Sequence, residues 1–211
     1  MGVNTNRWNR IRYSLYAPVY DRVVGFAEQR RRAIDALALQ PGERVLIVGA
    51  GTGADLPYLP EGVHVTAIDL TPAMIRRLEA RARHLEREVD ARVMDAQALP
   101  FPDGAFDAVL LHLILAVAPD GRAVAREAVR VTRPGGRLSV FDKFAPDGRR
   151  PSFVRRAANV VTNLVATSVT RQLGPLLDGL PVSVAHDEPA AFGNLFRIVL
   201  LRRGSGPTPR L

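Results

Sequence analysis

Short apolar runs alternate along the chain with longer segments that mix apolar and charged residues. The runs at about 44–49, 63–69 and 106–112 do not alternate with polar positions, which is typical of strands buried on both faces of a parallel sheet. Residues 71–88 instead repeat their apolar side chains at helical spacing. The apolar positions of this helix are Met74, Leu78, Ala82 and Leu85. Alternation of strand and helix predicts an α/β fold, a mostly parallel sheet with helices on both faces.

The remaining patterns complete this sheet and suggest how the chain is divided. Further strands are predicted at 91–94, 137–143, 182–185 and 195–201, and further helices at 19–39, 53–58, 120–132 and 151–170. Thr71 and Pro72 mark a helix start, as N-cap and first helical residue. We expect an N-terminal helical cap at 1–40, a main domain at 41–203 with a helical lid segment at 151–170, and a disordered tail at 204–211.

The first strand runs into the segment Gly49-Ala50-Gly51-Thr52-Gly53, with glycines at alternate positions. Glycine lets the backbone turn tightly and approach a ligand that a Cβ would block. In a doubly wound sheet, the first strand-to-helix turn is a nucleotide site. The spacing differs from the G-x-G-x-x-G of dinucleotide sites, we expect no basic residue near the turn, and Asp55 is expected to repel a phosphate. This favours a nucleoside ligand without phosphate, such as S-adenosylmethionine.

Polar residues also follow the other predicted strands. Asp69, Asp95, His112 and Asp142 each stand at or next to a strand end. The carboxyl ends of parallel strands meet at one edge of the sheet, where ligands of such folds bind. We therefore expect these side chains to line up along a ligand that lies across this edge.

Composition narrows the possible classes of protein. The length of 211 residues suits one domain, and no apolar run is long enough for a membrane span. Arg7, Arg10 and Arg12 are not followed by an apolar segment, so we expect no secretory signal. The absence of cysteine excludes disulfides, thiolate metal sites and cysteine nucleophiles, and it fits a cytoplasmic protein. We predict no metal site.

The net charge of +8 is unevenly distributed. Residues 1–40 hold seven arginines against three acidic residues, and 142–211 hold ten basic against five acidic residues. Residues 41–141 are close to neutral, with twelve against thirteen. Basic flanks favour an anionic partner such as a membrane surface or nucleic acid. The alternative is a general arginine bias, because every basic residue except Lys143 is arginine.

Five motifs follow one another in the first two thirds of the chain. They are Val48–Gly53, Ala67–Met74, Asp95–Phe101, Phe106–Val109 and Arg130–Gly136. In this order they resemble the class I S-adenosylmethionine-dependent methyltransferases over about residues 13–143. The most similar branch includes ubiquinone/menaquinone-biosynthesis and phosphatidylethanolamine N-methyltransferases. The pattern and the resemblance together predict a doubly wound, Rossmann-like sheet of seven strands, mostly parallel with an antiparallel last strand.

The resemblance implies a set of cofactor contacts. The glycine turn, from Gly49 through Ala50, Gly51 and Thr52 to Gly53, would lie against the methionine part of S-adenosylmethionine. Asp69 would accept hydrogen bonds from both ribose hydroxyls. Leu70 and Met74 would flank the adenine, and Asp95 with the backbone of Ala96 would bind its amino group. Tyr20, in a tyrosine-aspartate element, would cover the cofactor.

Methyl transfer requires a base only if the acceptor must lose a proton. His112, at the end of the fourth predicted strand, is the candidate general base, and Tyr20 is the second catalytic candidate. Contact with the cofactor or lining of the pocket is the alternative role for His112. Lys143 is expected either to meet an anionic head group or to pair with Asp142.

The flanks that carry the basic excess are also where this fold usually builds its acceptor pocket. Trp8, Ile11 and Leu15 lie beside arginines, and residues 149–165 combine arginines with apolar residues. We therefore expect a lipid-like acceptor, a phospholipid amine or a quinone precursor, at an anionic membrane. Replacing Arg149, Arg150, Arg155 and Arg156 by Ala is predicted to abolish flotation with anionic vesicles.

Three alternatives stay open. The first is a soluble methyltransferase for a small metabolite, with the flanking helices packed as a lid. The second is an NAD-type oxidoreductase, which would need glycine at position 54, where Ala54 stands. The third is an inactive cofactor-binding module. We expect no nucleic-acid substrate, because no Asp/Asn-Pro-Pro-Tyr/Phe motif for a flipped base follows the fourth strand.

Overall fold

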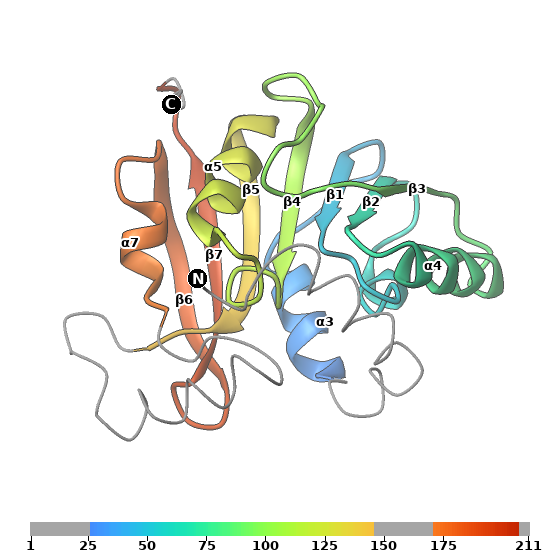
Figure 1. Cartoon of the computed structure of the whole chain (residues 1–211), viewed down its shortest axis with the longest axis horizontal. Helices are drawn as coiled ribbons and strands as arrows, with labels where there is room; N and C mark the ends of the chain where they lie inside the picture. The colour runs from blue at the N-terminus through green and yellow to red at the C-terminus, as the bar shows by residue number, and fades with distance from the viewer. Residues whose placement is uncertain (1–25, 146–170, 207–211) are drawn as a thin grey trace.

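A computed structural model describes residues 26–145 and 171–206, which form an α/β fold around one seven-stranded sheet (Figure 1). The strand order is β3-β2-β1-β4-β5-β7-β6. The strands are β1 (Arg44–Val48), β2 (His64–Asp69), β3 (Val89–Val93), β4 (Phe106–His112), β5 (Thr132–Lys143), β6 (Val182–Ala191) and β7 (Phe196–Arg203). The first five are parallel, and β7 is antiparallel to both β5 and β6. The predicted doubly wound sheet of seven strands is confirmed.

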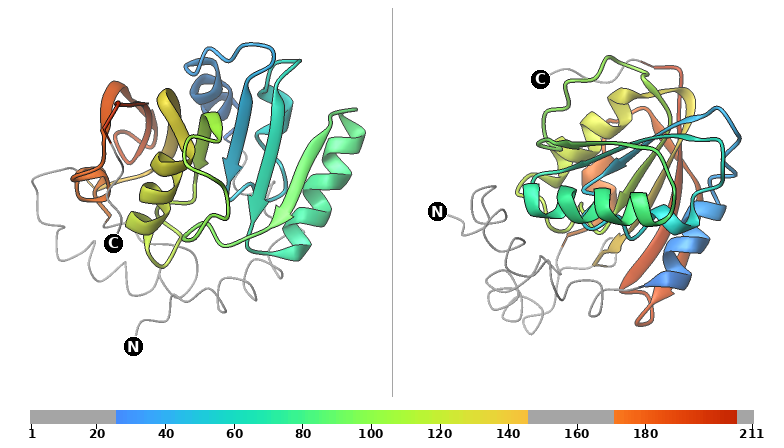
Figure 2. Two further views of the ribbon diagram at one scale, coloured as in Figure 1. Left: turned by 90° about the horizontal axis from the view of Figure 1, so that it is seen from above. Right: turned by 90° about the vertical axis from the view of Figure 1, so that its right-hand side faces the viewer.

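Helices cover both faces of this sheet. They are α3 (Ala27–Asp35), the 3-10 helix η1 (Leu56–Tyr58), α4 (Pro72–His84), α5 (Gly121–Val131) and α7 (Leu173–Leu177). Figure 2 shows α5 and α7 on one side of the sheet and α3 on the other. The helix α7 was not predicted. Within the described residues, no helix has the length and apolar character needed to cross a bilayer.

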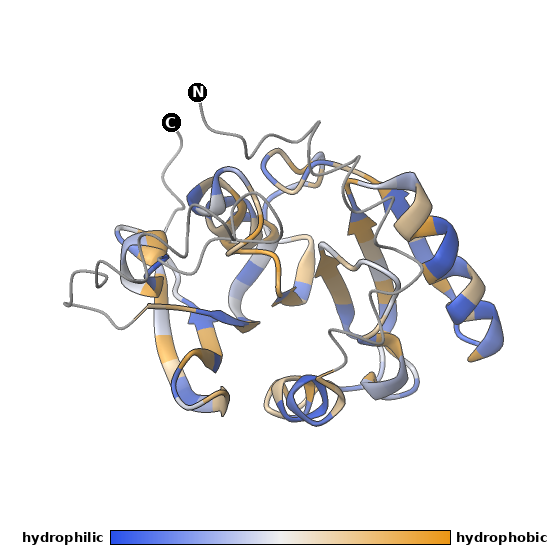
Figure 3. Ribbon diagram, turned by 60° about the horizontal axis from the view of Figure 1, so that its bottom comes forward, coloured by the Kyte–Doolittle hydropathy of each residue, from blue (hydrophilic) through white to orange (hydrophobic). Residues whose placement is uncertain are grey.

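Alternate residues of the central strands face two different cores. In β1, Leu46 and Val48 join the cluster under α5 and α7, whereas Val45 and Ile47 join the cluster under α3 and α4. In β4, Ala108 and Leu110 belong to the second cluster, whereas Val109 and Leu111, whose side chains point to the opposite face, belong to the first. Figure 3 shows the resulting apolar colour along the central strands. This burial on both faces is why the strands have no polar alternation in the sequence.

Several boundaries differ from those predicted. Helix α4 ends at His84 rather than 88, and Leu85 is 37% exposed instead of buried. Glu86 at φ +50° ends the helix, and the N–H of Arg87 donates to the carbonyl of Ala82. Thr71 is the N-cap residue of α4 and Pro72 its first helical residue, as predicted, although the side chain of Thr71 makes no capping hydrogen bond.

The other differences concern strand lengths and residues outside the described part. Strand β5 begins at Thr132, because Thr132 pairs with Phe106 before a register shift. Strand β6 extends to Ala191, past the predicted end at 185. The predicted cap, the lid segment at 151–170, Tyr20 and the tail beyond 206 lie wholly or partly outside the described residues, as do Trp8 and Arg149.

Candidate functional site

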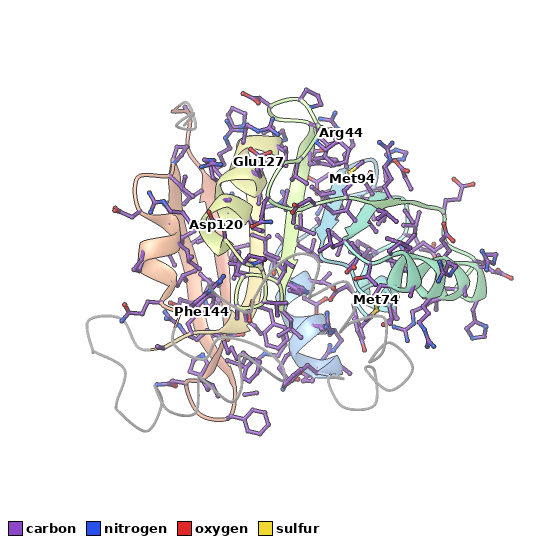
Figure 4. All side chains as sticks on the ribbon, viewed as in Figure 1. Arg44, Met74, Met94, Asp120, Glu127 and Phe144 are labelled. Carbon is purple, nitrogen blue, oxygen red and sulfur yellow. The ribbon has the colours of Figure 1, made fainter. Side chains whose placement is uncertain are left out.

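A cavity opens at the carboxyl ends of the parallel strands. Its walls come from the glycine turn after β1, Ile68–Thr71 with Met74 after β2, Met94–Gln97 after β3, and the β4–α5 loop. Figure 4 labels Met74 and Met94 on the α4 side of the molecule and Asp120 on the α5 side. The cavity thus lies at the edge of the sheet that was predicted to bind a ligand. This is also the point between β1 and β4 where the strand order reverses, and doubly wound sheets bind their ligands there.

The glycine turn is shaped by backbone conformation. Gly49 and Gly51 line the cavity, with φ of +69° and +56°. A Cβ on Gly49 would lie 2.7 Å from Cδ1 of Ile114, so any side chain there would require Ile114 to shift. Around Gly51 there is open space, and glycine is required there by its φ alone. Ala50, Thr52 and Gly53, which were expected to contact the cofactor, are not among the cavity-lining residues.

Asp69 presents a half-buried carboxylate to the cavity. Its Oδ2 accepts from the N–H of Gly51 at 2.9 Å and its Oδ1 from the N–H of Thr71 at 2.8 Å. Burial raises the pKa of Asp69, and these hydrogen bonds only partly oppose that rise. Among the described residues no basic side chain pairs with it. A carboxylate without a basic partner is stabilised by further hydrogen-bond donors. Two adjacent hydroxyls of a ribose would supply such donors.

Asp95 connects the end of β3 to the start of α5. Its Oδ1 accepts from the backbone N–H of Gln97 at 2.9 Å and from Nε2 of the same residue at 3.1 Å. The Oε1 of Gln97 accepts from the N–H of Asp120, whose carboxylate caps α5 at Ala123. Gln97 lines the cavity and was not predicted as a site residue. Its position two residues after Asp95 is the only sequence signal for it.

The β4–α5 loop forms the apolar wall of the cavity through Leu113, Ile114 and Val117. Two distant side chains hold this loop. Asp142 accepts from the N–H of Ala116 at 2.9 Å, and burial raises the pKa of Asp142 to about 6 despite its backbone hydrogen bonds.

Arg171 provides the other attachment. Its guanidinium donates to the carbonyl of Leu115, to that of Ala118 at 2.6 Å and to that of Pro119 at 3.0 Å. Burial lowers the pKa of Arg171, and the charge of Asp142 opposes this. No sequence pattern links Arg171 to a loop more than fifty positions earlier.

His112 does not reach the cavity, which corrects the expectation that it is a general base or cofactor contact. It lies on the same face of β4 as Ala108 and Leu110, and it is only 3% exposed. Its Nδ1 lies 2.8 Å from Oδ1 of Asp55 and its Nε2 lies 3.1 Å from Oγ of Ser139. Both ring nitrogens are therefore engaged inside the protein. Tyr20, the other catalytic candidate, lies outside the described residues.

Asp55 also differs from its expected role. It is buried and pairs with Nη1 of Arg30 at 2.8 Å. Burial alone would raise the pKa of Asp55, but the charges of Arg30 and His112 hold it well below its usual range. A basic residue therefore does lie near the turn, and the argument that Asp55 repels phosphate was wrong. Arg30 was missed because it is 25 positions away in sequence.

Lys143 acts on Asp142 through its charge, which lowers the pKa of that carboxyl. Its backbone N–H also donates to Oδ1 of Asp142 at 2.8 Å. The ammonium lies 6.0 Å from the ring centroid of Phe196.

Comparison with known families and proteins identifies relatives of this chain. A family described as "Methyltransferase domain" matches residues 46–140. A phosphatidylethanolamine N-methyltransferase of Cereibacter sphaeroides is 31% identical over 188 residues, covering 88% of this chain and 93% of that protein. A demethylmenaquinone methyltransferase of Renibacterium salmoninarum is 39% identical over 118 residues, 56% of this chain and 48% of that protein.

Other relatives share only part of their length with the chain. An uncharacterized protein of Mycobacterium tuberculosis is 41% identical over 116 residues, and the match covers 54% of this chain but 42% of that protein. Among solved structures, the [4+2]-cyclase SpnF has a TM-score of 0.81 at 18% identity, with 98% of each chain covered. The geranyl diphosphate C-methyltransferase of Streptomyces coelicolor has a TM-score of 0.68 at 16% identity, covering 83% of this chain and 75% of that one. At such identities these structures show the shared fold.

Proposed function

The chain belongs to the class I S-adenosylmethionine-dependent methyltransferases, and from this membership we propose that it methylates the amine of a phospholipid-like acceptor. The observation that carries the proposal is the match to a phosphatidylethanolamine N-methyltransferase along nearly the whole of both chains. A quinone precursor is the second candidate, because a demethylmenaquinone methyltransferase matches about half of each chain. Membership in this family also favours the methyl donor over the NAD-type alternative.

The cavity fits the methyl donor on features of its own. When bound, S-adenosylmethionine supplies a methyl group activated by a sulfonium. We propose that the backbone of Gly49 and Gly51 approaches its methionine part, and that Asp69 accepts from its ribose hydroxyls. Asp95 would accept from the adenine amino group, beside Ala96, with Leu70 and Met74 against the ring. Apart from the two glycines, which approach the ligand with their backbone, these residues offer either a carboxylate or an apolar surface. A nucleoside without phosphate requires such a lining.

The chain's own contribution to catalysis is then positional. The strand ends and the β4–α5 loop would hold the donor and exclude water on the side of Ile114 and Val117. Among the described lining residues the titratable side chains are Asp69 and Asp95, and both have a binding role in this proposal. In this proposal the amine acceptor loses its proton to solvent before it attacks the methyl group, without help from His112.

An aromatic cluster next to the cavity supports an apolar acceptor. Phe26 packs against Phe141, Phe192 and Phe196, with centroid distances of 5.5, 6.4 and 4.9 Å. Leu113 contacts this cluster and also lines the cavity. The register pairs Phe196 with Lys143, so the cluster lies at the carboxyl end of β5, the same edge as the cavity. An acyl or prenyl chain that leaves the cavity past Leu113 would meet these rings.

The tip of the β6–β7 hairpin supports contact with a membrane. Phe192 at this tip is 76% exposed, and residues 190–195 carry no charge. The acidic residues behind the tip are paired, Glu188 with Arg32 at 2.6 Å and Asp187 with Arg197. Insertion of the tip into a bilayer would therefore desolvate no unpaired carboxylate of this hairpin.

An activity screen with a labelled methyl donor tests the acceptor. Phosphatidylethanolamine in vesicles, a demethylated quinone precursor in the same vesicles and small soluble amines would be compared. We expect transfer to the phospholipid amine. Transfer to soluble amines alone would favour the small-metabolite alternative, and no transfer to any acceptor with intact donor binding would favour the binding-module alternative.

Flotation with anionic and neutral vesicles tests the membrane contact separately. Phe192→Ser is expected to reduce flotation of the full chain with anionic vesicles. Leu85→Ser, a matched change of an exposed leucine at the end of α4, is expected to leave it unchanged. Equal flotation of both variants and the unchanged protein would contradict the role of the hairpin tip.

A further inference from the structure

We propose that Gln97 is a positioning residue that sets the selectivity of the cofactor site for adenine. Its side-chain amide holds the carboxylate of Asp95, which lines the cavity, in place as an acceptor for the exocyclic amino group of the base. The inference rests on the adenine contact proposed for Asp95 and adds the residue that orients it. It does not depend on which acceptor is methylated.

The neighbours of Gln97 determine which end of its amide faces which group. The backbone nitrogen of Asp120 lies 3.0 Å from Oε1 of Gln97, and a backbone N–H can only donate. The oxygen end of the amide therefore faces Asp120, and its NH2 group faces Asp95. In the reversed orientation the NH2 group would meet another N–H, and the amide oxygen would meet a carboxylate. Both contacts would then be unfavourable, so the orientation is unambiguous.

Gln97 thus presents two donors to the carboxylate of Asp95. Nε2 of Gln97 lies 3.1 Å from Oδ1 and 3.3 Å from Oδ2 of Asp95, and the backbone nitrogen of Gln97 lies 2.9 Å from Oδ1. Rotation of the carboxyl group would lengthen these contacts, so they restrict it to one orientation. Donors match a carboxylate, which is an acceptor only. A ligand that binds the same group must therefore supply a donor as well.

The anchor on the other side of Gln97 is the start of α5. Asp120 is the N-cap of this helix, and its carboxylate accepts from the N–H of Ala123 at 2.9 Å. Gln97 and Pro119, the residue before Asp120, both line the cavity. The amide therefore connects the wall after β3 to the wall before α5. Because Oε1 is bound to a backbone N–H of a capped helix, the NH2 group is held toward Asp95.

Purine bases differ at the position that would meet Asp95. Adenine carries an amino group there, which donates a hydrogen bond. Hypoxanthine carries a carbonyl, which would face the acceptor oxygens of the carboxylate, and unsubstituted purine carries only a C–H. A site that holds its polar group in place rejects a ligand that leaves this group unpaired. The arrangement around Gln97 therefore favours an adenine nucleoside over the other two.

A purely structural role for Gln97 has a different signature. If the amide only linked β3 to α5, its loss would change the shape of the cavity and weaken every nucleoside ligand by the same factor. If it positions Asp95, its loss weakens only those ligands that carry the amino group. A comparison of ligands with and without this group, in the unchanged chain and in variants of Gln97, isolates the coupling between the two.

Calorimetric titration of the full chain provides this comparison. The ligands are S-adenosylhomocysteine and its analogue with purine in place of adenine. We expect the unchanged chain to bind S-adenosylhomocysteine about tenfold more tightly than the analogue, because a hydrogen bond to a charged group is gained.

Two variants then test the residue. Gln97→Glu keeps an acceptor for the N–H of Asp120 but offers Asp95 no donor, and Gln97→Met removes both contacts. In both, the ratio of the two Kd values should fall toward one, and in Gln97→Glu the Kd of the purine analogue should stay close to that of the unchanged chain. Gln40→Met is the matched control, because Gln40 is exposed and its Nε2 donates to the carbonyl of Ala38. Its ratio should equal that of the unchanged chain.

Each contrary result identifies the step that fails. Equal binding of both ligands by the unchanged chain would overturn the adenine contact of Asp95 and this inference with it, and that measurement requires no variant to fold. A preserved ratio in Gln97→Glu would overturn the role of Gln97 and leave the contact of Asp95 in place. A rise of both Kd values by the same factor would show a structural link only, which also overturns the role. The titrations contain no methyl acceptor, so they are independent of the screen that identifies it.

Discussion

Replacing Asp142 by Asn is expected to stabilise the protein at neutral pH, although it removes a buried, hydrogen-bonded carboxylate. Burial raises the pKa of Asp142 from its ordinary 3.8 to about 6, against the opposing hydrogen bonds from Ala116 and Lys143. One unit of pKa corresponds to about 1.36 kcal/mol, so the ionised form costs about 3 kcal/mol in the folded chain. Asn has a similar shape and no charge to desolvate, but its amide nitrogen cannot accept one of these two N–H groups, which lowers the gain by about 1 kcal/mol.

The sign of the pH dependence follows from linkage. A carboxyl whose pKa is higher in the folded than in the unfolded chain adds stability below about pH 4 and loses it as the pH rises through about 6. The free energy of unfolding of Asp142→Asn, minus that of the unchanged protein, should therefore be lowest near pH 4. Above about pH 7 this difference should be larger by up to about 3 kcal/mol.

Urea unfolding at several pH values measures this difference directly. Asp178→Asn, at an exposed position after α7, is the control and should give no pH-dependent difference. If Asp142→Asn were less stable than the unchanged protein at pH 8, the reasoning would be refuted. The hydrogen bonds that Ala116 and Lys143 donate to the carboxylate would then outweigh its desolvation.

Three further changes separate binding from stability. Asp69→Asn should weaken S-adenosylhomocysteine binding at least tenfold in calorimetry, and unchanged affinity would contradict the proposed ribose role of Asp69. The same change should slightly raise the thermal midpoint at neutral pH, because burial raises the pKa of Asp69 and the ionised carboxylate is therefore unfavourable. Gly49→Ala should abolish binding and cost at least about 1 kcal/mol in urea unfolding, because φ is +69° and Ile114 occupies the space of the Cβ; normal binding would show that the turn can open. Arg171→Met should cost about 3 kcal/mol, about 1 for each carbonyl left without a donor, and should raise the Kd; a change in neither would show that water replaces the guanidinium.

The elements that were predicted well are those whose signal is local. The strands β1, β2 and β4 are buried on both faces, so their apolar runs are continuous and easily recognised. The glycine turn and Asp69 follow strand ends, and a parallel sheet brings such ends together at one edge whatever the details of packing. Fold, cofactor and the carboxylate of Asp69 that faces the cavity could therefore be inferred from the order of short patterns.

The errors occur where a side chain's role depends on its partner. His112 follows an apolar strand in the same way as Asp69, yet its parity places it on the α3 face of the sheet, beside Asp55. Asp55 looked like an exposed acid near a ligand, and its neighbour is a buried arginine. Neither outcome is visible without knowing which faces meet.

The amino-acid sequence by itself determined the α/β fold, the cofactor turn and the family of this protein. The tertiary structure decided which polar groups face the cavity and which stabilise the interior, as in the pairs His112–Asp55 and Arg171–Ala118, 57 and 53 positions apart. The physical reason is range. Periodicity and turn chemistry are set within a few residues, whereas a buried ion pair or a loop attachment exists only after distant segments have packed and water has been excluded.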